Sequence, residues 1–172
     1  MEFSDVFRRL PSRYQLEEFL VYLSAHPERF PELIDLVFAN GDPKASFRAL
    51  WACEKVSQRW PEWWTEEQHR KIRGLAITSS HTGMIRLGLS ILNTLPRDEE
   101  PDIELMNRLY DLIIQPSYPP GVQSQAMRLL YELVKNNEDL RYEFFLVLDD
   151  VSEQVNSPAF RATRKNLVKR KP

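Results

Sequence analysis

Few side chains in this 172-residue sequence have the types and spacing that catalyse reactions or bind metals. The three histidines, His26, His69 and His81, are far apart, and none has a second ligand at metal-binding spacing. Cys53 is the only cysteine, and its place on the apolar stripe of a predicted helix favours a buried, unreactive thiol. The sequence has no glycine loop for phosphate, no HExxH and no serine nucleophile elbow. We therefore expect a non-enzymatic protein with no catalytic residues, no metal and no cofactor.

Basic residues are the functional candidates that recur at regular spacing. Four segments align on a shared pattern: SFRALWACEKV, MIRLGLSILNTL, QSQAMRLLYELV and AFRATRKNLVK. The aligned polar position is held by Arg48, Arg86, Gln125 and Arg161, which are separated by 38, 39 and 36 residues. A steady period in this range, with two amphipathic helices per unit, predicts a helical solenoid.

The spacing of apolar residues predicts about eight or nine helices and no convincing strand. Start signals support several of them. Asp42 is a predicted N-cap with Pro43 at the first helical position, and the sequence Thr-Glu-Glu-Gln from Thr65 is a capping box. The last helix is expected to begin after Asn156, Ser157 and Pro158. Most of the 12 prolines fall between the apolar-periodic segments, where they end helices.

The first of these repeats resembles the HEAT and armadillo-like repeat family. The resemblance rests on Asp42-Pro43, on Phe47-Arg48 with the arginine six residues after the aspartate, and on Ala49 and Ala52. Ser80, Pro119 and Val155 stand where the other repeats would carry the turn aspartate. The resemblance implies an all-α, right-handed α-α superhelical solenoid of about four helix pairs with terminal capping helices.

The predicted organisation is a single domain of HEAT-like repeats over residues 1–172. Residues 1–27 form an N-terminal cap, in which one helix covers the first pair. The repeats are expected at residues 28–60, 61–97, 98–136 and 137–172. The charged last helix covers the other end, because terminal repeats need a polar outer face.

The near-neutral net charge of −2 hides a separation of sign between the two helix layers. The second helices of the repeats together carry +12, the first helices −13 and the first 27 residues −1. The family resemblance implies that second helices line the concave face, so that face is expected to be basic and to attract anionic partners. The candidate binding residues are Lys44, Arg48, Lys55, Arg59, Arg86, Arg97, Arg128, Lys135, Arg161 and Arg164.

Two of these features also have purely structural explanations. Cations near helix C-termini interact favourably with the helix dipole, which accounts for Arg59, Arg97 and Lys135 without a ligand. Trp60, Trp63 and Trp64 form either an aromatic platform for a base or peptide, or a wedge that fills the joint between two repeats. The wedge is the interpretation that we favour.

The predicted function is a non-enzymatic scaffold that binds a protein partner through a basic concave surface. The alternative is a nucleic-acid-binding protein similar to the DNA alkylation repeat proteins, whose helix pairs form a basic groove for duplex DNA. The catalytic residues of that group have no matching positions here. No stretch approaches about 18 apolar residues, so we expect no membrane span and a cytoplasmic location.

Overall fold

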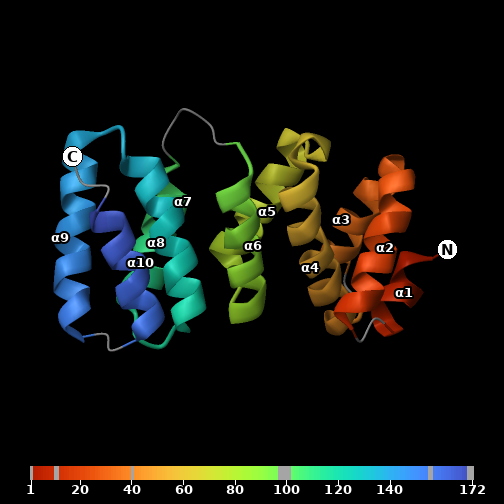
Figure 1. Ribbon diagram of the computed structural model, residues 1–172, viewed down its shortest axis with the longest axis horizontal. Helices are drawn as coiled ribbons and strands as arrows, with labels where there is room; N and C mark the ends of the chain where they lie inside the picture. The colour runs from red at the N-terminus through yellow and green to blue at the C-terminus, as the bar shows by residue number, and fades with distance from the viewer. Residues whose placement is uncertain (1, 10–11, 40, 97–101, 155–156, 170–172) are drawn as a thin grey trace. The chain divides into compact units, whose positions relative to one another are not determined.

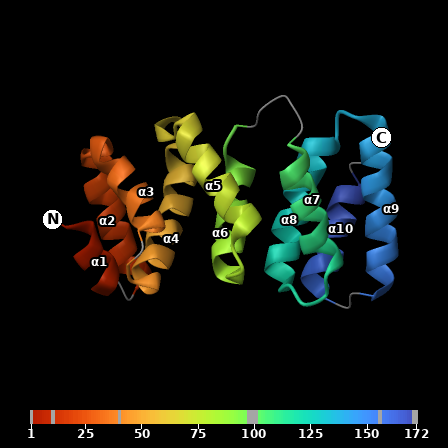
Figure 2. The ribbon, with the colours of Figure 1, turned by 180° about the vertical axis from the view of Figure 1, so that it is seen from behind.

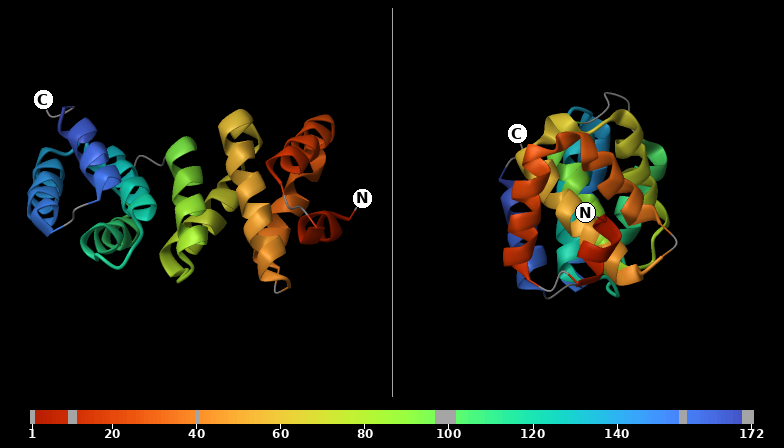
Figure 3. Two further views of the ribbon diagram at one scale, coloured as in Figure 1. Left: turned by 60° about the horizontal axis from the view of Figure 1, so that its bottom comes forward. Right: turned by 90° about the vertical axis from the view of Figure 1, so that its right-hand side faces the viewer.

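The computed structural model describes residues 2–9, 12–39, 41–96, 102–154 and 157–169, and these residues include no strand (Figure 3). The helices are α1 (Phe3–Arg9), α2 (Arg13–Ala25), η1 (Pro27–Arg29), α3 (Phe30–Phe38), α4 (Pro43–Arg59), η2 (Pro61–Trp63), α5 (Glu66–Thr78), α6 (Thr82–Thr94), α7 (Ile103–Ile114), α8 (Pro120–Val134), α9 (Glu138–Gln154) and α10 (Pro158–Val168). None of these helices is both long and apolar enough to cross a bilayer. The all-α prediction is confirmed.

Residue contacts divide the chain into two compact units, an N-terminal unit of residues 1–72 and a C-terminal unit of residues 73–172. Helix α5 contributes residues to both units. Each predicted repeat range contains two α-helices: α3 and α4, α5 and α6, α7 and α8, and α9 and α10. The repeat boundaries themselves stay a prediction.

The helix start signals operate as the sequence predicts. The Asp42 carboxylate accepts the N–H of Lys44 at 2.8 Å. Thr65 and Gln68 form the capping box in both directions, since each backbone N–H donates to the other side chain, at 2.9 and 3.3 Å. Ser157 accepts the N–H of Phe160 at the start of α10. Short polar side chains therefore fix where these helices begin.

The N-terminal unit is assembled around α4, which packs against α3, α1 and α2 (Figure 1). The structure has two helices, α1 and α2, where the sequence predicts a single N-terminal helix. Ser12 is the N-cap of α2, since its side chain accepts the N–H of Gln15. Phe3 and Phe7 of the short α1 pack edge-on against Phe19 of α2, with ring centroids 5.0 and 4.8 Å apart. This aromatic cluster anchors a seven-residue helix that has little stability of its own.

Arg29 connects three helices of the N-terminal unit. Its guanidinium lies 4.3 Å from the centroid of the Phe3 ring in α1 and donates to the Tyr22 hydroxyl in α2 at 2.6 Å. It also donates twice to the carboxylate of Glu32 in α3, at 2.9 and 2.6 Å. The hydrogen bond from Arg29 lowers the pKa of Glu32. One cation therefore fixes the relative positions of α1, α2 and α3.

Arg48 performs a second connecting role from α4. Its Nη1 donates to the backbone carbonyls of Phe7 and Arg8 at 2.9 and 2.8 Å. These carbonyls belong to the last turn of α1, and the carbonyls of a last turn lack N–H partners within their own helix. Arg48 is thus a C-terminal cap supplied by another helix.

The C-terminal unit is built around α8, which contacts α6, α7, α9 and α10 (Figure 1). The second helices of three consecutive predicted repeats, α6, α8 and α10, are therefore neighbours through α8. Apolar residues from all five helices and from Ala76 of α5 form one core. Phe144 and Phe160 are fully buried in it. Each helix buries a face that it could not cover alone, as expected for stacked helix pairs.

Replacing Arg48 with methionine should destabilise the N-terminal unit, because the carbonyls of Phe7 and Arg8 lose a charged donor while the aliphatic stem is kept. We expect a loss of about 2 kcal/mol in the free energy of unfolding. All four tryptophans lie in this unit, at positions 51, 60, 63 and 64, so urea unfolding followed by tryptophan fluorescence measures it selectively.

The matched control is Lys44→Met, since Lys44 is an exposed cation on the same helix whose side chain has no hydrogen bond or ion pair with the described residues. That variant should change the free energy by less than about 0.5 kcal/mol. Equal unfolding midpoints for the two variants would contradict the capping role of Arg48.

Candidate binding surface

Helix α8 is buried on every side except one narrow stripe. The exposed or half-buried residues of that stripe, which recur every three or four positions, are Gly121, Gln125, Arg128, Glu132 and Lys135. Arg128 is exposed and makes no hydrogen bond or ion pair with the described residues. We call these five positions, together with Arg86 of α6 and Arg141 of α9, the cationic stripe.

Helix α6 joins the cationic stripe at two points. A Cβ atom placed on Gly121 would lie 3.3 Å from Cδ of Arg86, so the arginine passes directly over the first turn of α8. Further along, the Asn93 amide donates to the backbone carbonyl and the side-chain oxygen of Gln125, at 3.1 and 2.9 Å. The Arg86 guanidinium is exposed and unpaired among the described residues.

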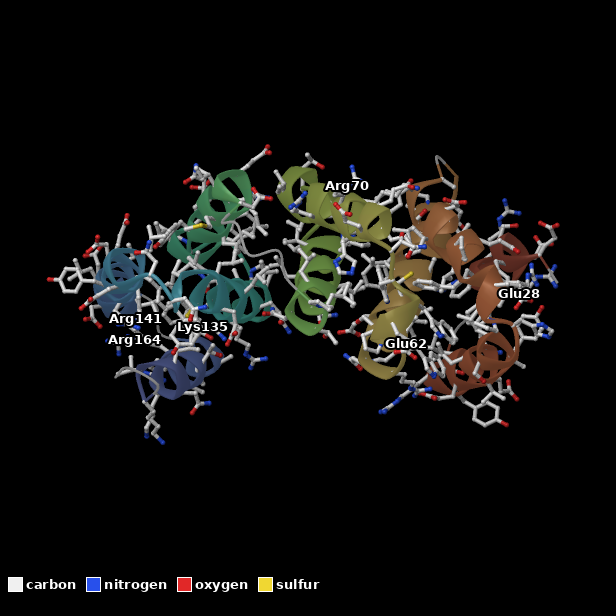
Figure 4. The ribbon with its side chains drawn as sticks, turned by 90° about the horizontal axis from the view of Figure 1, so that it is seen from above. Glu28, Glu62, Arg70, Lys135, Arg141 and Arg164 are labelled. Carbon is white, nitrogen blue, oxygen red and sulfur yellow. The ribbon has the colours of Figure 1, made fainter. Side chains whose placement is uncertain are left out.

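Helix α9 joins the other end of the cationic stripe. Arg141 Nη1 donates to the backbone carbonyl of Lys135 at 3.0 Å, and Lys135 Nζ forms an ion pair with Glu132 at 2.7 Å. Figure 4 labels Lys135 and Arg141, together with Arg164. Arg141 was not among the sequence candidates, because it belongs to a first helix. Its position four residues after the N-cap Asn137, just beyond a short turn, was the available signal.

The remaining candidates of the C-terminal unit are placed differently. Arg164 of α10 pairs with Asp149 of α9, and Arg161 is exposed on α10 without a partner among the described residues. Arg97 lies outside the residues that the structure describes. Among the described sequence candidates of this unit, Arg86, Arg128 and Lys135 are the ones that lie along α8 or contact its stripe.

The four candidates of the N-terminal unit have mostly intramolecular roles. Arg48 caps α1, and Arg59 pairs with Glu17 of α2 at 2.7 Å. Lys55 pairs with its neighbour Glu54 at 3.2 Å. Lys44 alone is exposed with an unpaired side chain in the described structure. Of these four candidates, Lys44 is therefore the one whose charge is not used within the described structure.

The tryptophan cluster packs within the N-terminal unit. Trp64 is buried and meets the ring of Phe30 at 5.1 Å and that of His69 at 6.2 Å, so it joins α3 to α5. Trp63 also contacts Phe30, and Trp60 stacks on Trp63 at 4.6 Å with an angle of 8° between the rings. These contacts support the structural interpretation of the cluster as a wedge between helices.

The cysteine and the histidines, which could in principle react or bind a metal, also have roles in the fold. Cys53 is fully buried, and burial raises the pKa of its thiol. His81 caps α6 by accepting the N–H of Met84 at 3.2 Å, and His26 lies against Tyr22 and Glu28. In the part of the chain that the structure describes, no three His, Cys, Asp or Glu side chains are grouped so that they could hold a metal ion.

Comparison with known protein families identifies a match over most of the chain. The family model described as the HEAT repeat domain matches residues 6–171, which is nearly the whole chain. No curated protein and no solved structure matched the chain.

Cys53 should act as a reporter of unfolding in the N-terminal unit. Because the thiol is fully buried and its pKa is raised, we expect a thiol reagent such as DTNB to react with the native protein at least about 1,000-fold more slowly than with the urea-unfolded chain. Arg48→Met should accelerate the native-state reaction by about 30-fold, in line with its expected loss of stability. Rapid labelling of the unaltered native protein would show that the thiol is accessible.

Proposed function

The chain belongs to the HEAT repeat domain family, and we propose that it is a non-enzymatic scaffold whose cationic stripe binds an acidic segment of a partner protein. HEAT repeats commonly mediate protein interactions. The proposal assigns the contact to the second helices of the C-terminal unit, and in particular to α6 and α8. It also places the protein in the cytoplasm, where a single buried thiol such as Cys53 stays reduced.

The observation that carries this proposal is that Arg86 and Arg128, two members of the cationic stripe, have no partner among the described residues. Arg86 passes over Gly121 at one end of the stripe, and Arg128 follows seven residues after Gly121 on the same face. Neither guanidinium has a carboxylate partner among the described residues. Unpaired cations fixed on a rigid helix attract carboxylates with little loss of conformational entropy in the protein.

The position of Glu132 favours an acidic protein segment over a nucleic acid. This carboxylate lies within the stripe between Arg128 and Lys135, and it is half-buried. A phosphate backbone carries a charge at every residue and would meet Glu132 with repulsion, whereas a peptide can place a neutral residue there. The experiment must therefore distinguish binding of an acidic peptide from binding of duplex DNA.

The test measures binding of a fluorescein-labelled peptide of twelve glutamates by fluorescence anisotropy, across a salt series from about 50 to about 200 mM. We expect binding that weakens as salt rises. The double variant Arg86→Glu/Arg128→Glu should weaken it about tenfold or more, because two attractive charges become repulsive. A fluorescein-labelled duplex of twenty base pairs is titrated in parallel. Tighter binding of the duplex than of the peptide would favour the nucleic-acid alternative.

The matched control is Arg13→Glu/Arg70→Glu, which makes the same charge change at two exposed arginines without partners in the described structure. Figure 4 labels Arg70 on α5. Arg48 is unsuitable for either variant, because its replacement alters the capping of α1. Equal losses in the two double variants would show that net charge alone governs binding, and the proposed site would be rejected.

A further inference from the structure

The outward faces of α7 and α9 form a second surface with a different character. These first helices of the C-terminal unit lie side by side (Figure 2). The exposed residues of α7 are Ile103, Glu104, Asn107, Asp111 and Ile114, and those of α9 are Glu138, Asp139, Tyr142, Glu143, Leu146, Asp149 and Asp150. We call these twelve residues the acidic–apolar face.

Large apolar side chains are concentrated on this face. Tyr142 and Leu146 are 62% and 52% exposed, and Ile103 and Ile114 are 71% and 46% exposed. Tyr142 and Leu146 are four residues apart, so they are neighbours on the surface of α9. Ile103 and Ile114 are eleven residues apart, which places them on one side of α7, three turns from each other. Isolated exposed apolar residues are ordinary, but Tyr142 and Leu146 together form a local apolar patch on α9 that water covers at a cost.

The charged members of this face all have one sign. Seven of the twelve residues of the face are carboxylates, and none is basic. The two arginines of these helices are half-buried and turned to backbone carbonyls, Arg108 to Ser79 at 3.1 Å and Arg141 to Lys135 at 3.0 Å. Asp149 is paired with Arg164 of α10. A strongly negative rim therefore surrounds exposed apolar side chains.

Tyr110 of α7 is half-buried and packs against the core of the C-terminal unit. The Tyr110 hydroxyl of α7 has no hydrogen-bond partner in the described structure. Burial, with a further contribution from the Glu143 carboxylate, raises its pKa to about 12.

We infer that the acidic–apolar face is a docking site for a basic amphipathic helix of a partner protein. Such a helix presents apolar side chains at intervals of three or four residues and can carry lysines or arginines on both flanks. Its apolar stripe covers Tyr142 and Leu146, and its flanking cations meet the carboxylates of α7 and α9. This inference does not depend on the proposed function, because it concerns other helices and a partner of opposite charge.

A second copy of this chain is a poorer match for the face. The cationic stripe on α8 supplies the positive charge, but its members include no large apolar side chain that could cover Tyr142 or Leu146. A foreign helix with both properties matches the charge and the hydrophobicity together. Self-association is therefore the competing outcome of the test.

The experiment titrates a fluorescein-labelled, twenty-residue amphipathic helix of leucine and lysine against the full chain. We expect micromolar binding, and we expect Tyr142→Ser/Leu146→Ser to weaken it about tenfold. Glu143→Gln/Asp150→Asn should weaken it several-fold at low salt and much less at high salt. The matched control is Tyr14→Ser/Val21→Ser on α2, where side chains of similar size are 70% and 69% exposed.

Three results would overturn the inference. The first is an equal loss of affinity in the Tyr14→Ser/Val21→Ser control. The second is equally tight binding of a twenty-residue peptide of lysine and serine with the same charge, which would reduce the effect to unspecific attraction. The third is concentration-dependent self-association, measured by sedimentation, that Tyr142→Ser/Leu146→Ser abolishes. Thermal melting by circular dichroism confirms that every variant is folded.

Discussion

The need to satisfy the carbonyl groups at helix C-termini governs how these helices fit together. The last turn of a helix leaves its carbonyls without N–H partners, and side chains from neighbouring helices bond several of them here. Arg48 caps α1, Arg108 bonds the Ser79 carbonyl just after α5, and Arg141 bonds the Lys135 carbonyl after α8. The buried Gln123 amide does the same for α7, at Ile113 and Gln115. Each bond joins two different helices, so the same donors that complete the helices also fix their packing.

This constraint decides which charges remain for a partner. A count of charges by helix layer treats every cation alike, and it gives +12 for the second helices. The contacts separate these cations into those bonded within the fold, such as Arg48, Arg59 and Arg164, and those without a partner among the described residues, such as Arg86 and Arg128. A basic layer is therefore not equivalent to a basic surface, because bonded guanidiniums contribute little attraction at a distance.

The sequence predicted well those features that depend on local chemistry. The caps at Asp42 and Thr65 depend on a side chain and a backbone N–H at most three residues away, and the buried Cys53 depends on the period of its own helix. The division of the N-terminal cap into α1 and α2 was missed because α1 has only seven residues and is anchored by a ring from elsewhere, Phe19. The role of Arg48 could not be predicted, since its acceptors are about 40 residues away in the chain and depend on which helix packs beside it.

The opposite faces of the C-terminal unit follow from how its helices share one core. Helix α8 contacts four other helices and keeps a single narrow stripe for solvent, so its few outward positions are polar and fixed. Helix α9 already buries Phe144, Phe145 and Leu148, and the core gains nothing from Tyr142 and Leu146 on the outside. A helix selected only for stability and solubility would carry polar side chains at those two positions. Packing therefore explains the inner face of α9 but not its outer apolar pair, and the docking of a partner helix that we infer gives this pair a physical role.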